Sequence, residues 1–298
     1  MAFRANPNAQ PARLVVAALA LGAFYWGLYR MPLPGRSGAG LDPDKSRELQ
    51  EESAVMRRFG NWKRALKPTL KLHEAYPESH IYLAQLAEIY DHLGRYRDEA
   101  AIWEQFVARA PRPVEACPHI ADAYQKMGAP RQAIQAAEKC LALDPNSPDQ
   151  TFYLGRAHEQ SGDLDGAARI YEQGLAASPN NLDLAVGLAR VRLGQGKSAE
   201  AEALTARVLR QSPKNPDALL VMGLACEEQG RRSEAKTYFE RGVQVADGYA
   251  DLHLALASLD EQNADLEGAI AHYQKAIAID GSNADAARRL ALLRRARE

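Results

Sequence analysis

A proline that recurs every 34 residues constrains this chain more than any other feature of its sequence. Its positions are Pro77, Pro111, Pro145, Pro179 and Pro213, continued by Asp247 and Gly281. A second series has the same period: Gly60, Gly94, Gly128, Gly162, Gly196, Gly230 and Ala264. A third is mostly alanine: Ala65, Glu99, Ala133, Ala167, Ala201, Ala235 and Ala269. Seven units are thus in register without an insertion, which indicates a repeat architecture.

Each unit has the pattern of a helical hairpin. The glycine falls where the chain must turn between two helices, because glycine adopts a positive φ at little cost. The proline ends the second helix. Apolar residues recur at helical spacing on both sides of the glycine. One column of the first helix holds only small residues, which permit the second helix to approach closely: Ala87, Ala121, Gly155, Ala189, Gly223 and Ala257.

A 34-residue unit that carries L-[AG]-x-x-Y, then A-x-x-x-[FYW], then a proline resembles the tetratricopeptide repeat (TPR) family. The resemblance covers residues 46–283 and implies an all-α, right-handed α-solenoid whose first helices line a concave protein-binding face. The expected repeats are 46–79, 80–113, 114–147, 148–181, 182–215, 216–249 and 250–283. Residues 284–298 predict a capping helix that covers the open end of the array.

Three repeats depart from the pattern. In the first, Glu52 and Ser53 replace the apolar-small pair, and Pro68 is expected to kink or shorten the second helix. In the second, Glu99 occupies the alanine column. In the seventh, Ala264 replaces the turn glycine.

The N-terminal segment has a different character. Residues 14–29 are uncharged and mostly apolar, and lie between Arg13 and Arg30. As a helix they would span about 24 Å, against about 30 Å for the hydrocarbon core, and the flanking arginines and nearby aromatic residues compensate for the difference. We therefore predict that residues 1–30 form an N-terminal tail and a single transmembrane helix. Residues 31–45, with three prolines and three glycines, predict a flexible linker.

A cleaved signal peptide is the alternative. Ser37, Gly38 and Ala39 offer small residues at the cleavage spacing, and cleavage would leave a secreted TPR protein. For an uncleaved anchor, the charges around the span slightly favour a cytoplasmic N-terminus. The expected location is then the cell membrane, with the TPR body periplasmic or extracytoplasmic. A cytoplasmic orientation of the body stays open.

Composition and motifs exclude several functions. The 37 lysines and arginines against 38 aspartates and glutamates leave no bulk positive field for nucleic acid. No phosphate-binding loop, nucleophile elbow or H-E-x-x-H motif is present, and no two histidines are spaced i, i+4. We predict no enzymatic activity, no cofactor and no metal site.

Two cysteines allow two interpretations. Cys117 lies eleven residues before Gly128 and Cys140 twelve after it, so the two should lie level across the hairpin. A disulfide is plausible there if the body lies in an oxidising compartment. Both nevertheless occupy core columns, where cysteine is a good small hydrophobe, and this favours two buried thiols. Cys226 occupies a core column alone.

The register places candidate partner contacts on the first helices. Arg156 and Arg190 occupy the same column of adjacent repeats beside aromatic residues, where they could hold a carboxylate. The alternative is that these arginines pair with Glu159 and Asp122 and bind nothing. The full candidate set is Phe152, Tyr153, Arg156, Arg190, Glu88, Asp122 and Leu224.

The sequence therefore predicts a non-catalytic, membrane-tethered protein-interaction scaffold. It would bind peptides or helices of partner proteins on its concave surface, in envelope assembly or secretion. A self-associating structural platform is the alternative. The oligomeric state is not predicted.

Overall fold

A computed structural model describes residues 41–281 and 283–297. These residues form 15 α-helices and one 3-10 helix, and no strand occurs among them. The predicted tail and anchor (1–30) and residues 31–40 of the predicted linker lie outside the described residues. None of the described helices combines the length and apolar character needed to cross a membrane.

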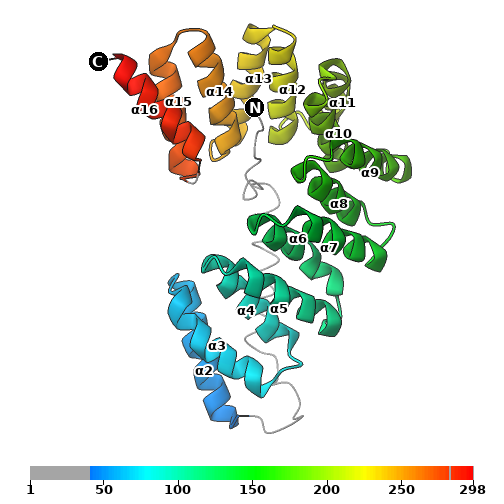
Figure 1. Cartoon of the computed structure of the whole chain (residues 1–298), viewed down its shortest axis with the longest axis vertical. Helices are drawn as coiled ribbons and strands as arrows, with labels where there is room; N and C mark the ends of the chain where they lie inside the picture. Colours follow the sequence, from blue (N-terminus) through cyan, green and yellow to red (C-terminus); the bar gives the residue numbers. More distant parts are fainter. Residues whose placement is uncertain (1–40, 282, 298) are drawn as a thin grey trace. The chain divides into compact units, whose positions relative to one another are not determined.

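Contacts divide the described residues into two compact units, 41–163 and 164–297. The helices are labelled in Figure 1. The first unit contains α2 (Pro43–Arg58), α3 (Trp62–Ala75), α4 (His80–His92), α5 (Tyr96–Arg109), the 3-10 helix η1 (Pro113–Ala116), α6 (Cys117–Lys126), α7 (Pro130–Leu143) and α8 (Pro148–Gln160). The second contains α9 (Leu164–Ala177), α10 (Leu182–Gly194), α11 (Ser198–Gln211), α12 (Pro216–Glu228), α13 (Arg232–Val245), α14 (Ala250–Gln262), α15 (Leu266–Ile279) and α16 (Ala284–Arg297).

The turn column behaves as the repeat pattern predicts. All six glycines have φ between 67° and 84°, and Ala264 has φ 62°. At Gly94 the backbone N–H donates to the Asp91 carbonyl at 2.9 Å, and the next N–H, of Arg95, donates to the Tyr90 carbonyl at 2.9 Å. Bonds of this kind satisfy the last carbonyls of the first helix. The prediction of an all-α repeat solenoid is confirmed.

Small residues let neighbouring helices of the repeats pack closely. The alanine column is fully buried at six of its seven positions: Ala65, Ala133, Ala167, Ala201, Ala235 and Ala269. A Cβ atom at Gly223 would lie 2.3 Å from the ring of Phe239, and one at Gly187 would lie 2.7 Å from the ring of Tyr171. The rings of Phe239 and Tyr171, which lie on second helices, therefore occupy the space that a side chain at Gly223 or Gly187 would need. Gly187 is a close-approach position outside the predicted small column.

The first repeat replaces apolar contacts with hydrogen bonds. Ser53 Oγ and Thr69 Oγ1 lie 2.6 Å apart, and both residues are fully buried. Pro68 lies inside α3, yet α3 has 14 residues, as α5 and α7 do. Of the two expected effects of Pro68, a kink or a shorter helix, the structure therefore shows no shortening.

Cys117 and Cys140 form a disulfide that joins α6 to α7, with their Cα atoms 5.7 Å apart. The interpretation that favoured two buried thiols is therefore wrong. The predicted level placement across the hairpin is what brings the two sulfur atoms together. Cys226 is a buried free cysteine.

The last helix, α16, closes the hydrophobic core of the second unit. Ala286, Leu290 and Leu293 are buried and belong to one cluster with Ile270 and Tyr273 of α15. Leu292 of the same helix is 52% exposed. The buried stripe of α16 is thus narrower than its leucine content indicates.

Candidate functional site

Ion pairs join the first helices of neighbouring repeats in the first unit. The Arg57 guanidinium on α2 lies 2.8 Å from the Glu88 carboxylate on α4. Lys126 Nζ on α6 lies 2.5 Å from Asp91 of α4 and 2.8 Å from Asp122 of its own helix. Glu88 and Asp122, two of the predicted partner contacts, are thus each bound to a cation of this chain.

Lys126 is the centre of the larger of these networks. Its ammonium group also lies 5.3 Å from the centre of the Tyr96 ring. Burial lowers the pKa of Lys126, but its hydrogen bonds to Asp122 and Asp91 outweigh burial and raise it. The ammonium group is therefore held charged, which stabilises the two carboxylates beside it.

A buried carboxyl group lies next to this network. Glu99 of α5 is 3% exposed, and its Oε2 atom has no hydrogen-bond partner among the described residues. Burial, followed by the negative charge of Asp91, raises the pKa of Glu99 to about 7. The only sequence signal for this group is the glutamate at an alanine position of the repeat.

The predicted aromatic contacts lie on α8, at the end of the first unit. The rings of Phe152 and Tyr153 meet edge to face with their centres 6.0 Å apart. Arg156 follows one turn later, is half-buried, and forms no ion pair with any described residue. A guanidinium group beside aromatic rings suits a carboxylate or another acidic group.

Two predicted contacts belong to the second unit. Arg190 is half-buried on α10, and its charge acts on Tyr249, whose hydroxyl donates a 2.6 Å hydrogen bond to Asp217. Burial, followed by the charge of Asp217, raises the pKa of Tyr249. Leu224 of α12 is partly buried against two core clusters, so packing accounts for much of its surface. Arg190 and Arg156 lie in different units.

The sequence interpretation missed a histidine pair between α14 and α15. His253 Nδ1 lies 3.2 Å from His272 Nδ1, and His253 Nε2 lies 3.0 Å from the Asp247 carbonyl. Asp260, which is 2% exposed, holds Lys236 at 2.8 Å and lies 3.8 Å from His272 Nε2. If the Nε2–H of His253 donates to the carbonyl, the Nδ1 atom of His253 can accept a hydrogen bond from the Nδ1–H of His272. The described residues contain no group of three or more ligands that could hold a metal ion.

Family models described as tetratricopeptide repeat match several parts of the chain. One matches residues 158–211 and 192–259, a second matches 120–181, and a third matches 250–283. Together these matches run from residue 120 to residue 283, which is more than half of the 298 residues. No sequence among the curated proteins matches this chain.

Solved structures share the fold at low sequence identity. A tetratricopeptide repeat protein of Parabacteroides merdae is 15% identical with a TM-score of 0.68, covering 84% of this chain and 99% of its own. One chain in the structure of the APC/C hetero-tetramer Cut9–Hcn1 is 16% identical with a TM-score of 0.60; the match covers 93% of this chain and 52% of that one. A TPR protein of Thermus thermophilus is 20% identical with a TM-score of 0.54, covering 60% and 98%.

Proteins of this kind are generally protein-interaction scaffolds, and their fold is typically non-catalytic. The in-phase columns, the positive-φ turns and the matches to family models agree with one another. The chain therefore belongs to the tetratricopeptide repeat family.

Proposed function

We propose that this protein is a non-catalytic interaction scaffold held at a membrane by residues 14–29. Its repeats bind peptide or helix segments of partner proteins on the surface of the first helices, in envelope assembly or secretion. The role in the envelope rests on the combination of an apolar leading segment with an interaction array.

Arg156 is the observation that carries the binding proposal. It is half-buried on a first helix, has no ion pair among the described residues, and lies one turn from the Phe152–Tyr153 pair. A partly desolvated guanidinium group without a carboxylate gains energy when a ligand supplies one. We therefore expect the partner segment to bring an acidic side chain or a terminal carboxylate to Arg156 and an apolar side chain to the two rings.

The other candidate residues have supporting roles in this proposal. Glu88 and Asp122 present carboxylates whose charges are already balanced by Arg57 and Lys126. They would accept hydrogen bonds from the partner without adding net charge. Arg190 and Leu224 supply a cation and an apolar contact in the second unit.

The disulfide supports an extracytoplasmic location for the body. Disulfides persist in oxidising compartments and are rare in the cytosol, where thiols are kept reduced. Because Cys117 and Cys140 are both buried, the bond is also protected from exchange. We propose a periplasmic or other extracytoplasmic body behind an N-terminal anchor.

In vivo photo-crosslinking from position 153 tests the binding surface. We expect Arg156→Ala and Arg190→Ala each to weaken the crosslinked partner band, because each variant removes a cation. Arg131→Ala, which removes an exposed arginine from the second helix α7, is the matched control. Unchanged bands in both test variants would refute the role of the arginines.

An alkaline phosphatase fusion after Glu298 tests the location of the body. This enzyme needs disulfides of its own and is active only outside the cytoplasm. We expect an active fusion. An inactive fusion that is expressed at the same level would place the body in the cytoplasm.

A further inference from the structure

The second helix of the first repeat, α3, carries a basic face. Lys63, Lys67 and Lys71 are spaced by four residues, so they lie along one side of the helix, and Arg64 lies beside them. All four side chains are exposed, and none forms an ion pair with any described residue. Glu74 is the one acidic residue of this helix.

This concentration of positive charge is specific to α3 among the second helices of the first unit. α5 has two arginines and three acidic residues, and α7 has two basic residues and one acidic residue. The exposed lysines of α3 take no part in helix packing. Their surplus charge is therefore available to a ligand outside the chain.

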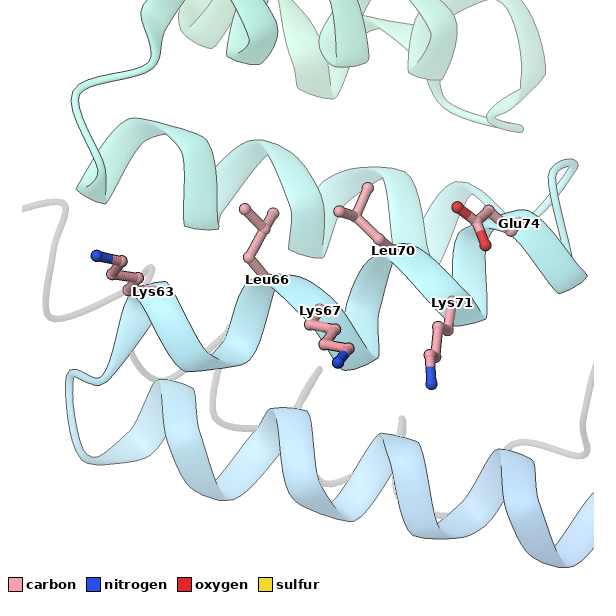
Figure 2. Close-up of a pocket in the computed structure, with 6 residues that line it drawn as sticks. All are labelled: Lys63, Leu66, Lys67, Leu70, Lys71 and Glu74. Atoms are coloured by element: carbon pink, nitrogen blue, oxygen red, sulfur yellow. The ribbon is translucent and has the colours of Figure 1, made fainter.

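The lysines border a shallow depression of about 320 Å³. Its lining residues are Lys63, Leu66, Lys67, Leu70, Lys71 and Glu74. In Figure 2, Leu66 and Leu70 point toward the helix drawn above α3, whereas Lys67 and Lys71 point away from that helix. The two leucines pack against the core of the first unit. The surface thus combines an apolar floor with a row of ammonium groups.

An exposed aromatic ring lies next to this face in the chain. Phe59, in the turn between α2 and α3, is 79% exposed, the highest value among the exposed large hydrophobic residues that the structure describes. A ring of this kind inserts at the boundary between headgroups and acyl chains, where basic residues beside it meet anionic lipids.

We propose that the α3 basic face, which consists of Lys63, Arg64, Lys67 and Lys71, docks on anionic phospholipid headgroups at a bilayer surface, with Phe59 of the preceding turn as an additional apolar contact. The choice of a bilayer rather than an acidic protein rests on the proposed membrane tether. Residues 31–42 can span at most about 43 Å, so the first hairpin stays near the bilayer that holds residues 14–29. Each basic residue near an anionic surface strengthens binding about fivefold, and salt weakens this effect.

Amine acetylation of the full chain tests this proposal. The chain is reconstituted into vesicles of phosphatidylcholine alone or of phosphatidylcholine with phosphatidylglycerol, and the accessible lysines are labelled with a membrane-impermeant reagent. We expect the acetylation rates of Lys63, Lys67 and Lys71 to fall at least about threefold in the anionic vesicles and to recover in high salt. Lys139 and Lys214, both exposed, are internal controls whose rates should not change.

Variants separate the face from general attraction to charge. Lys67→Glu/Lys71→Glu should abolish the protection of Lys63, and Phe59→Ser should reduce it. Lys139→Glu/Lys214→Glu, with the same change in net charge, should leave it intact. Because all these side chains are exposed, the variants should fold as the parent does.

Two outcomes overturn the docking proposal. One is an equal acetylation rate of Lys63 in the two kinds of vesicle. The other is protection by a polyglutamate peptide without protection by anionic vesicles, which would assign the face to an acidic protein. Flotation with phosphatidylcholine vesicles reports separately on the tether. A chain that fails to float with neutral vesicles, but is protected by anionic ones, would refute the tether and support the α3 basic face.

Discussion

Cys117 at the start of α6 and Cys140 near the end of α7 are linked by a disulfide, so the third hairpin is closed covalently at the end away from its turn. The bond encloses a segment with a sequence separation of 23 residues. In the chain-entropy description, closing a loop of this size stabilises the folded state by about 3 kcal/mol.

We therefore expect Cys117→Ala/Cys140→Ala to lower the free energy of unfolding by about 2–4 kcal/mol. Urea denaturation of the parent under non-reducing conditions gives the reference. Adding a reductant should bring the parent close to the double variant and leave the variant unchanged. A parent that is insensitive to reductant would contradict this expectation.

Replacing the buried carboxyl group of Glu99 should stabilise the first unit above neutral pH. The pKa of Glu99 is raised to about 7 in the folded protein, from 4.5 in the unfolded chain. The folded state therefore holds an extra proton between these values, and stability falls as the pH rises from about 4.5 to 7. We expect Glu99→Ala, which restores the residue of the other repeats, to gain up to about 3 kcal/mol at pH 8.

The same variant should show little advantage near pH 4.5, because the carboxyl group is then neutral in the parent too. Glu99→Gln keeps the volume and removes the charge, so it should share the gain in part. Thermal unfolding at pH 5 and pH 8 measures the difference. An equal shift at both pH values would mean that packing, rather than ionisation, is responsible.

Glycine at position 264 should stabilise the last hairpin. Ala264 has φ 62°, a conformation that costs a residue with a Cβ atom about 1 kcal/mol or more. Glycine removes this cost, but part of the gain in stability is offset because glycine has more conformational freedom than alanine in the unfolded chain. We expect Ala264→Gly to add about 0.5–1 kcal/mol in urea denaturation.

The reverse substitution provides the matched control. Gly230 has φ 77°, and a Cβ atom there would meet no atom within 4 Å. Gly230→Ala should therefore destabilise by about 1 kcal/mol through backbone conformation alone. Changes of the same sign in the two variants would refute this account.

Acid should weaken the second unit through the histidine pair. Burial, aided by His253 and Lys236 and opposed by Asp260, lowers the pKa of His272 below 6.5. The unfolded chain therefore binds this proton more readily, and the stabilising effect of the neutral ring is lost as the pH falls below about 6.5. We expect hydrogen exchange of α14 and α15, corrected for the intrinsic pH dependence, to speed up between pH 7.5 and pH 5.5.

His272→Gln should remove most of that pH dependence, because glutamine can still donate to His253 Nδ1 without titrating. His73, whose pKa is also lowered by burial, lies in the first unit, so His73→Gln is the control. Exchange that accelerates equally in His272→Gln would assign the effect to another group.

The helices and turns were predictable because local residues specify them. Each turn between two helices contains a residue with positive φ, a conformation that glycine adopts at little cost and alanine at a higher one, and this residue recurs every 34 positions. The disulfide was not predictable from the sequence, because a buried position in the repeat accommodates a free cysteine thiol and a disulfide-bonded cysteine equally well. The folded hairpin holds the two Cα atoms 5.7 Å apart, a separation that permits the bond.

The candidate site was predictable as a set of positions, but its interactions were not. Lys126 reaches Asp91, which is 35 residues earlier in the chain, only because α4 and α6 come together at a particular offset. The periodicity places both residues on first helices without setting that offset. The 34-residue periodicity carries no information on which protein binds this surface.

Substantial contacts among the described helices join elements that are neighbours or next neighbours in the chain. Each hairpin can therefore form as soon as its own residues leave the ribosome or a translocation pore, without waiting for distant segments. Such growth leaves the apolar side of the newest hairpin uncovered until the following one arrives. Among the described helices, α16 is the one after α15 in the chain that packs against it, so a chain that stops before Ala284 would leave the apolar side chains of α15 exposed to water and prone to association.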